Sequence, residues 1–94
     1  MKHYILNFKG VNSYLEFHER IMQSLDFSDY YGKNLDAFWD CITDMDAPCT
    51  IHITEINSLP TDLKEYLQND IYKILKEAKE WFSSINMLFD FIVE

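Results

Sequence analysis

The chain has 94 residues, of which 48% are hydrophobic, and a formal net charge of −8. This length allows one hydrophobic core, and we expect residues 1–94 to form a single domain. The negative charge disfavours direct binding to nucleic acid or to an anionic membrane surface, and it suits a basic protein partner. No apolar run approaches the roughly 18 residues of a membrane span.

Its two cysteines, Cys41 and Cys49, are too few for a disulfide framework and form no Cys-x-x-Cys unit. The first eight residues resemble a strand and are too short and too interrupted for a signal peptide. We therefore expect reduced cysteines in a cytoplasmic protein that is monomeric when free.

The first half of the chain predicts a strand and then a helix. Residues 3–8 are apolar and β-prone, and Gly10 ends the strand with a turn. Ser13 and Glu16 form a capping box at the start of a helix that runs to about Leu25. The buried face of this helix is predicted to hold Tyr14, Phe17, Ile21 and Leu25, which places His18 on the polar surface.

A tight loop around Gly32 then leads into a helix capped by Asn34. Since Gly32 is one of only two glycines, we expect a left-handed or strained backbone there. At about 100° per residue, Leu35, Phe38 and Ile42 share the face predicted to be buried. The opposite face holds Asp36, Asp40, Thr43 and Asp44, with Trp39 on the border, and no Lys or Arg occurs from Asn34 to Leu63.

The second half predicts a strand, two helices and a last strand. Residues 49–54 alternate and are β-branched, with His52 as a structural mid-strand residue. A short helix lies within 58–67, and Asn69 caps a helix over about 70–82. Residues 85–93 predict a buried parallel strand. The fold is thus expected to be α/β, with a small three-stranded parallel sheet packed by about four helices.

The sequence contains only weak indications of a catalytic or metal-binding site. Asp36 and Asp40 could share a divalent metal, or act as an acid–base pair with His52. However, the chain has no Gly-rich phosphate loop, no His-Glu-x-x-His motif and no EF-hand calcium loop. Cys41 has acids as its nearest charged neighbours, which is unfavourable for a nucleophile. We predict no enzyme activity, no cofactor and no metal site.

The run Tyr30-Tyr31-Gly32-Lys33-Asn34-Leu35-Asp36-Ala37-Phe38-Trp39-Asp40 resembles the signature of the barstar family of intracellular ribonuclease inhibitors. The resemblance extends weakly over nearly all 94 residues. It implies a barstar-like fold and a basic ribonuclease as partner, whose active site is occluded by acidic residues on a helix.

The resemblance also implies residue roles. Asp40 would mimic a phosphate, and Asp36 would pair with a cation at the rim of the ribonuclease cleft. The remaining contacts would come from Tyr30, Asn34 and Trp39, from the backbone of Gly32, and from Thr43 and Glu77. Structural alternatives stay open: Asp36 as a helix-dipole anion, Trp39 as a core residue, and Glu77 as a partner of Lys73.

Two features depart from the family pattern. Asp44-Met45-Asp46 replaces a usual glycine and aromatic residue, and Lys33 adds a cation beside the acids. Both leave the target ribonuclease open. The alternatives are an adaptor of the same fold that binds a non-nuclease protein, and a small metal-dependent enzyme.

Overall fold

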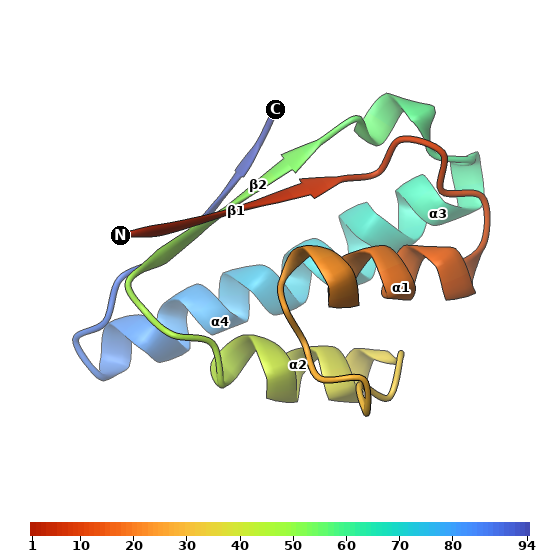
Figure 1. The fold of residues 1–94 in the computed structure, drawn as a ribbon. Helices are drawn as coiled ribbons and strands as arrows, with labels where there is room; N and C mark the ends of the chain where they lie inside the picture. The colour runs from red at the N-terminus through yellow and green to blue at the C-terminus, as the bar shows by residue number, and fades with distance from the viewer.

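The sheet of the computed structural model, which describes all 94 residues, has three parallel strands in the order β1-β2-β3. They are β1 (Lys2–Asn7), β2 (Cys49–Thr54) and β3 (Phe89–Val93), with β2 in the centre (Figure 1). The predicted α/β fold with a parallel sheet is therefore confirmed, and the second predicted strand has the expected bounds.

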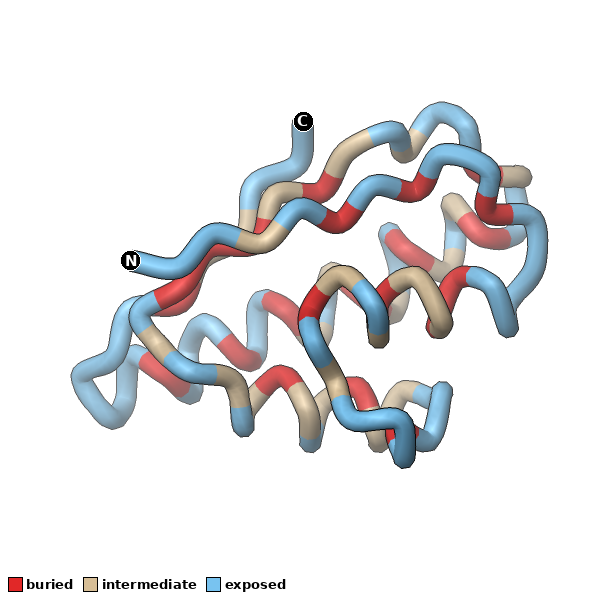
Figure 2. Tube along the Cα trace, viewed as in Figure 1, coloured by how far each residue is buried: buried red, intermediate tan, exposed pale blue.

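The helices α1 (Tyr14–Ser24), α2 (Leu35–Thr43), α3 (Thr61–Tyr66) and α4 (Tyr72–Ser84) lie on one side of the sheet (Figure 1). A short 3₁₀ turn, η1 (Ile56–Ser58), precedes α3. Helices on one side are what right-handed crossovers between strands in sequence order produce. The buried residues of β2 and those of the helices face one another in the space between the sheet and the helices (Figure 2).

The core is one cluster of 20 buried apolar residues. Alternate strand residues, such as Leu6, Ile51 and Ile53, point into it from the sheet. The opposite sheet face has no helix over it, so Ile5 is 58% exposed. On that face His3 and His52 are hydrogen-bonded through their ring nitrogens at 2.9 Å, which gives His52 the structural position expected for it.

The last strand differs from the prediction. It begins at Phe89 rather than Ile85, because α4 continues to Ser84 and Asn86 takes a left-handed conformation (φ 60°) in the turn that follows. It is also an edge strand whose last two residues are exposed. The apolar run that predicted a buried strand includes Met87 and Leu88, which are exposed in the turn.

The prediction that Asn69 caps the last helix is wrong. Residues Leu67–Ile71 form a π-helical turn, η2, that joins α3 to α4 without a break. The backbone of the residues at both junctions is α-helical. The fold therefore has three separate helical runs rather than about four.

The prediction for α1 is correct at its cap and wrong in its buried face. Ser13 caps the helix as expected, and its Oγ accepts a hydrogen bond from the Glu16 N–H at 3.1 Å. The buried face, however, is Phe17, His18 and Ile21, whereas Tyr14 is exposed. The sequence interpretation placed His18 on the surface because the helical wheel was centred on a buried face that included Tyr14.

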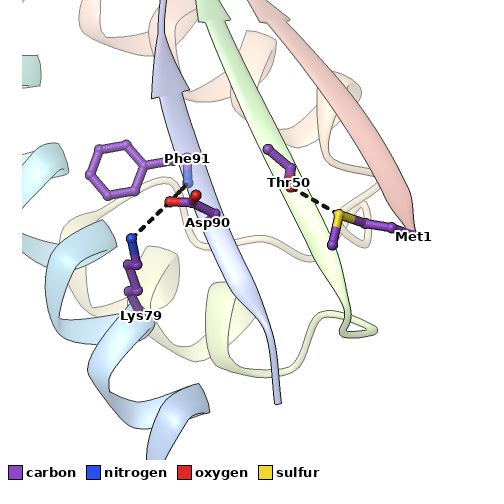
Figure 3. Close-up of polar contacts among 5 residues, drawn as sticks. All are labelled: Met1, Thr50, Lys79, Asp90 and Phe91. Carbon is purple, nitrogen blue, oxygen red and sulfur yellow. Dashed lines mark hydrogen bonds and ion pairs between the residues drawn. The ribbon is translucent and has the colours of Figure 1, made fainter.

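A side-chain contact ties α4 to the edge strand. Lys79 Nζ donates to Asp90 Oδ1 at 3.0 Å, and Asp90 Oδ1 also accepts from the Phe91 N–H at 2.9 Å (Figure 3). The Lys79 hydrogen bond lowers the pKa of Asp90 below its usual value. Across the sheet, the Thr50 hydroxyl lies 3.3 Å from the Met1 sulfur (Figure 3).

Candidate functional site

The local sequence of α2 fixes which of its side chains are exposed. The Asn34 Oδ1 accepts a hydrogen bond from the Ala37 N–H at 2.8 Å, which confirms the predicted N-cap. Phe38 and Ile42 are fully buried, so Asp36 and Asp40 must project from the opposite face, where both are exposed. The helix therefore presents two carboxylates, one turn apart, on a rigid support.

A groove of about 420 Å³ runs between α2 and α4, and we call it the acidic groove. It brings together three of the predicted site residues on α2 with the one predicted on α4. Its lining residues are Leu35, Asp36, Trp39, Asp40, Ile74 and Glu77. Residues 40 and 77 are far apart in sequence, and the packing of α2 on α4 joins them.

None of the three carboxylates in the acidic groove is paired. The two carboxylates that contact a basic side chain are Glu94, which lies 3.3 Å from His52 Nδ1, and Asp90, which is paired with Lys79. Glu77 is therefore not paired with Lys73, contrary to one structural alternative, and Lys79 is engaged by the edge strand. No third His, Cys, Asp or Glu is placed to complete a metal site with Asp36 and Asp40.

Trp39 lies on the border between the two faces of α2, as expected. It is half-buried and packs against the core cluster, yet it also lines the acidic groove. A ring held in this way is rigid and still offers apolar surface to a partner. Asp36 likewise serves two roles, since it lies in the first turn of α2, near the positive end of the helix dipole, and also lines the groove.

The loop that precedes α2 separates two adjacent tyrosines. Tyr30 is 96% exposed, whereas Tyr31 is only 5% exposed. The left-handed residue is Lys33 (φ 55°) and not Gly32, so that expectation was wrong. Gly32 lies in a tight place instead, since a Cβ atom there would be 3.1 Å from the Ala37 Cβ, closer than an ordinary van der Waals contact.

Thr43 does not line the acidic groove. Its hydroxyl donates to the Trp39 carbonyl at 2.9 Å, within its own helix. Asp44 and Asp46, which depart from the family pattern, line a second groove of about 260 Å³ that also includes Lys2 and Cys41. The extra acids therefore lie on the other flank of α2. Burial raises the pKa of the Cys41 thiol, and the charges of Asp40 and Asp44 raise it further. A raised pKa is unfavourable for a nucleophilic cysteine.

Sequence reasoning missed the polar centre of this region. His18 is 3% exposed, and its ring nitrogens bond the hydroxyls of Tyr31 and Tyr66, each at 2.7 Å. The spacing of Phe17, Ile21 and Leu25 leaves room for one neighbouring residue on the buried face, and His18 fills it. That spacing could have identified His18, but the partners, 13 and 48 residues away, give no local signal.

The fold defines the class of this protein as a barstar-like α/β domain. The family model described as Barstar (barnase inhibitor) matches residues 1–94. A Bacillus subtilis (strain 168) protein named "Putative ribonuclease inhibitor YrdF" is 35% identical over 81 residues, which cover 85% of this chain and 88% of the relative. The chain belongs to the barstar family. None of its helices has the length and apolar character needed to cross a membrane.

Proposed function

We propose that this protein inhibits a basic ribonuclease by inserting the acidic face of α2 into the active site of that enzyme. The observation that carries the proposal is the acidic groove, where three unpaired carboxylates surround a half-buried tryptophan. Asp40 and Glu77 lie outside the first turn of their helices and have no cationic partner within the fold, so a cationic partner outside it best explains their position. Family membership supports the same conclusion.

The inhibition follows from the shape and charge of the two partners. A ribonuclease active site binds a phosphodiester through cationic side chains, and arginine pairs with carboxylates and phosphates in similar bidentate geometry. Asp40, in the middle of α2, takes the place of the phosphate, while Asp36 and Glu77 pair with cations around it. RNA is excluded because its binding site is occupied, so the inhibitor needs no chemistry, cofactor or metal.

Residues of the loop and of α2 add the neutral contacts. Tyr30, Asn34 and Trp39 provide aromatic and hydrogen-bonding surface, and Gly32 provides backbone. Thr43, which is half-buried, extends the contact at the end of α2. Two free cysteines, one of them buried, suit a reducing compartment, and we place the protein in the cytoplasm as a monomer that protects its producer from a ribonuclease toxin.

The test is inhibition of barnase, the enzyme that the family description names. Cleavage of a fluorescent RNA is titrated with the wild-type protein and with the variants Asp40→Asn and Glu77→Gln. Both variants keep the side-chain size and remove one charge. We expect stoichiometric inhibition by the wild type, competitive with RNA, and weaker inhibition by each variant, most of all by Asp40→Asn.

Two matched controls remove the same charge elsewhere. They are Asp46→Asn and Glu80→Gln. Asp46 lies on the other flank of α2, and Glu80 lies outside the acidic groove on the same helix as Glu77. Both should inhibit nearly as well as the wild type. Equal losses in all four variants would leave only a general charge effect, and no inhibition of any ribonuclease would favour a family member that binds a non-nuclease protein.

A further inference from the structure

A buried histidine joins three separate elements below the face that carries the acids. His18 belongs to α1, Tyr31 to the loop before α2, and Tyr66 to the end of α3. Both ring nitrogens of His18 are bonded, Nδ1 to the Tyr31 hydroxyl and Nε2 to the Tyr66 hydroxyl, each at 2.7 Å. The histidine is 3% exposed, so water does not compete freely for these bonds.

Tyr31 anchors the loop that carries Tyr30 and Asn34. It is the buried residue of segment 28–34, and its ring lies 5.2 Å from the ring of Phe27. The other bonds of the segment are local, such as Tyr31 N–H to the Ser28 carbonyl at 2.9 Å and Asn34 Nδ2 to the Gly32 carbonyl at 3.3 Å. The bond from Tyr31 to His18 is therefore the polar contact that fixes the loop to the rest of the molecule.

The bridge also lies directly under the start of α2. A crevice of about 370 Å³ has His18 and Tyr66 in its wall, and the same crevice is lined by Lys33, Asn34 and Asp36. Movement of His18 or of Tyr31 would therefore change the position of the loop, of the helix cap and of the first acid of α2 together.

We infer that His18 is a positioning residue: through Tyr31 it holds the Tyr30–Asn34 loop in the conformation that a partner binds, and it does so only while its imidazole is neutral. This inference rests on the proposed function for its effect on binding. His18 itself touches no partner, because it is buried beneath the loop.

The dependence on protonation follows from the burial of the ring, because two hydroxyls could bond either a neutral or a protonated imidazole. A neutral imidazole donates from one nitrogen and accepts at the other, which matches two hydroxyls. Burial raises the pKa of Tyr31 and raises that of Tyr66 to about 12, so both partners stay hydroxyls. A protonated ring would instead place a positive charge in a site where burial disfavours it.

The charged and titratable groups around the ring do not remove this cost. Lys33 and Asp36 line the crevice with opposite charges, and Tyr14 lies on the same helix as His18. The charge of Asp70 contributes to the raised pKa of Tyr66, and Cys41 contributes to the raised pKa of Tyr31. Desolvation is accordingly the cause that lowers the pKa of His18 below its usual value.

The first test needs no partner. Amide protection factors, which correct for the intrinsic pH dependence of exchange, are measured in the free protein for β2 and for Tyr30 and Tyr31, the two loop amides that are hydrogen-bonded. Removing one hydrogen bond in Tyr31→Phe or Tyr66→Phe should lower loop protection by about tenfold, equal to about 1.4 kcal/mol, while β2 changes less. Lowering the pH of the wild type from about 7.5 to 5.5 should loosen the same residues, in the range where histidine titrates.

Two further variants make the test specific. Tyr72→Phe is the matched control, because the Tyr72 hydroxyl is buried without a hydrogen-bond partner, and its removal should leave the loop unchanged. His18→Gln can donate and accept through its amide, so it should retain more loop protection than His18→Leu and should abolish the loosening at low pH.

The second readout is inhibition of barnase by the same proteins. We expect Tyr66→Phe to weaken inhibition about tenfold, in parallel with loop protection, and Tyr72→Phe to have no effect. Unchanged loop protection in both Tyr31→Phe and Tyr66→Phe would overturn the inference, whatever the inhibition. If the wild type fails to inhibit barnase, the proposed function fails for that enzyme, and the protection factors alone decide whether His18 positions the loop.

Discussion

Asp40 has an unusual position for a residue that would serve only the fold. It is exposed in the middle of α2, one turn after Asp36, and it forms no ion pair. Like charges at positions i and i+4 of a helix repel each other by about 0.2–0.5 kcal/mol. At the scale of single residues, this carboxylate costs a little stability, which agrees with the binding role that we propose for it.

We predict that Asp40→Ala leaves the free energy of unfolding unchanged or raises it by about 0.2–0.5 kcal/mol. Binding to a ribonuclease should become weaker by about 2–5 kcal/mol, the usual cost of removing one partner of a buried charge pair. The barnase–barstar complex is itself one of the systems from which this range comes. Urea denaturation and calorimetric titration with barnase measure the two effects. Asp46→Ala is the control, and a loss of stability with intact affinity would show that Asp40 is structural.

His18 makes stability depend on pH. Burial lowers the pKa of His18 in the folded protein below the usual 6.5, so between these two pKa values the unfolded chain binds a proton that the folded chain does not. Stability should therefore fall as the pH drops below about 6.5 and should stop falling on this account below the folded pKa. His18→Gln should show a smaller loss between pH 7.5 and 5.5 in urea denaturation. An identical loss in both proteins would assign the effect to other groups.

At the scale of elements, the π-turn between α3 and α4 acts as a one-residue insertion in a longer helix. The buried residues of this run are Leu63, Leu67, Ile71, Leu75, Ala78 and Phe82, spaced four, four, four, three and four residues apart. Three successive steps of four drift by about 120° around a regular α-helix, and the wider π-turn absorbs part of this drift. Removing one residue from the turn would give alternating steps of four and three, which suit an ordinary α-helix.

We therefore predict that deletion of Asn69 is tolerated, with a change in the free energy of unfolding of about 1 kcal/mol or less. Insertion of an alanine after Asn69 should cost much more, because a spacing of five residues turns the apolar face of α4 away from the sheet. Circular dichroism and urea denaturation of both variants give the comparison. A deletion as damaging as the insertion would mean that the π-turn itself is needed for the fold.

The same elements show how far the sequence predicts the structure. The helix after Asn34 and the strand over residues 49–54 were predicted correctly because their signals are local: a side-chain cap, a 3.6-residue apolar pattern and a β-branched alternation. Asn69 was misread as a cap because a π-turn has no recognised local pattern. β3 was predicted too long because Met87 and Leu88 are apolar but exposed.

The candidate site divides in the same way. Asp36, Trp39 and Asp40 lie on one helix, so their common exposure follows from periodicity. Their meeting with Glu77 in the acidic groove depends on the packing of α2 against α4, and only the family resemblance pointed to Glu77 beforehand. The bridge through His18 depends on tertiary contacts across three elements, which no single segment encodes.

At the scale of the whole molecule, charge is distributed unevenly. The net charge is −8, and the segment from Asn34 to Leu63 contains no Lys or Arg. The acidic groove is lined by residues of α2 and α4. These two helices lie in the layer on one side of the sheet, away from its open face (Figure 1). On the proposed function, the net charge of the whole molecule attracts a basic enzyme, and the acidic groove is where we expect it to bind.

The salt dependence of association tests this arrangement. Raising the salt concentration from about 20 mM to about 500 mM shortens the screening length from about 20 Å to a few ångströms, so the steering force no longer reaches an approaching partner. The association rate constant with barnase should fall at least tenfold, while the dissociation rate constant, set by contacts already desolvated, changes less. Stopped-flow measurements with Trp39 fluorescence as the reporter separate the two constants. Because the protein has a second tryptophan, Trp81, the signal is checked in Trp81→Phe. An association rate constant that is equal at both salt concentrations would contradict charge-driven docking.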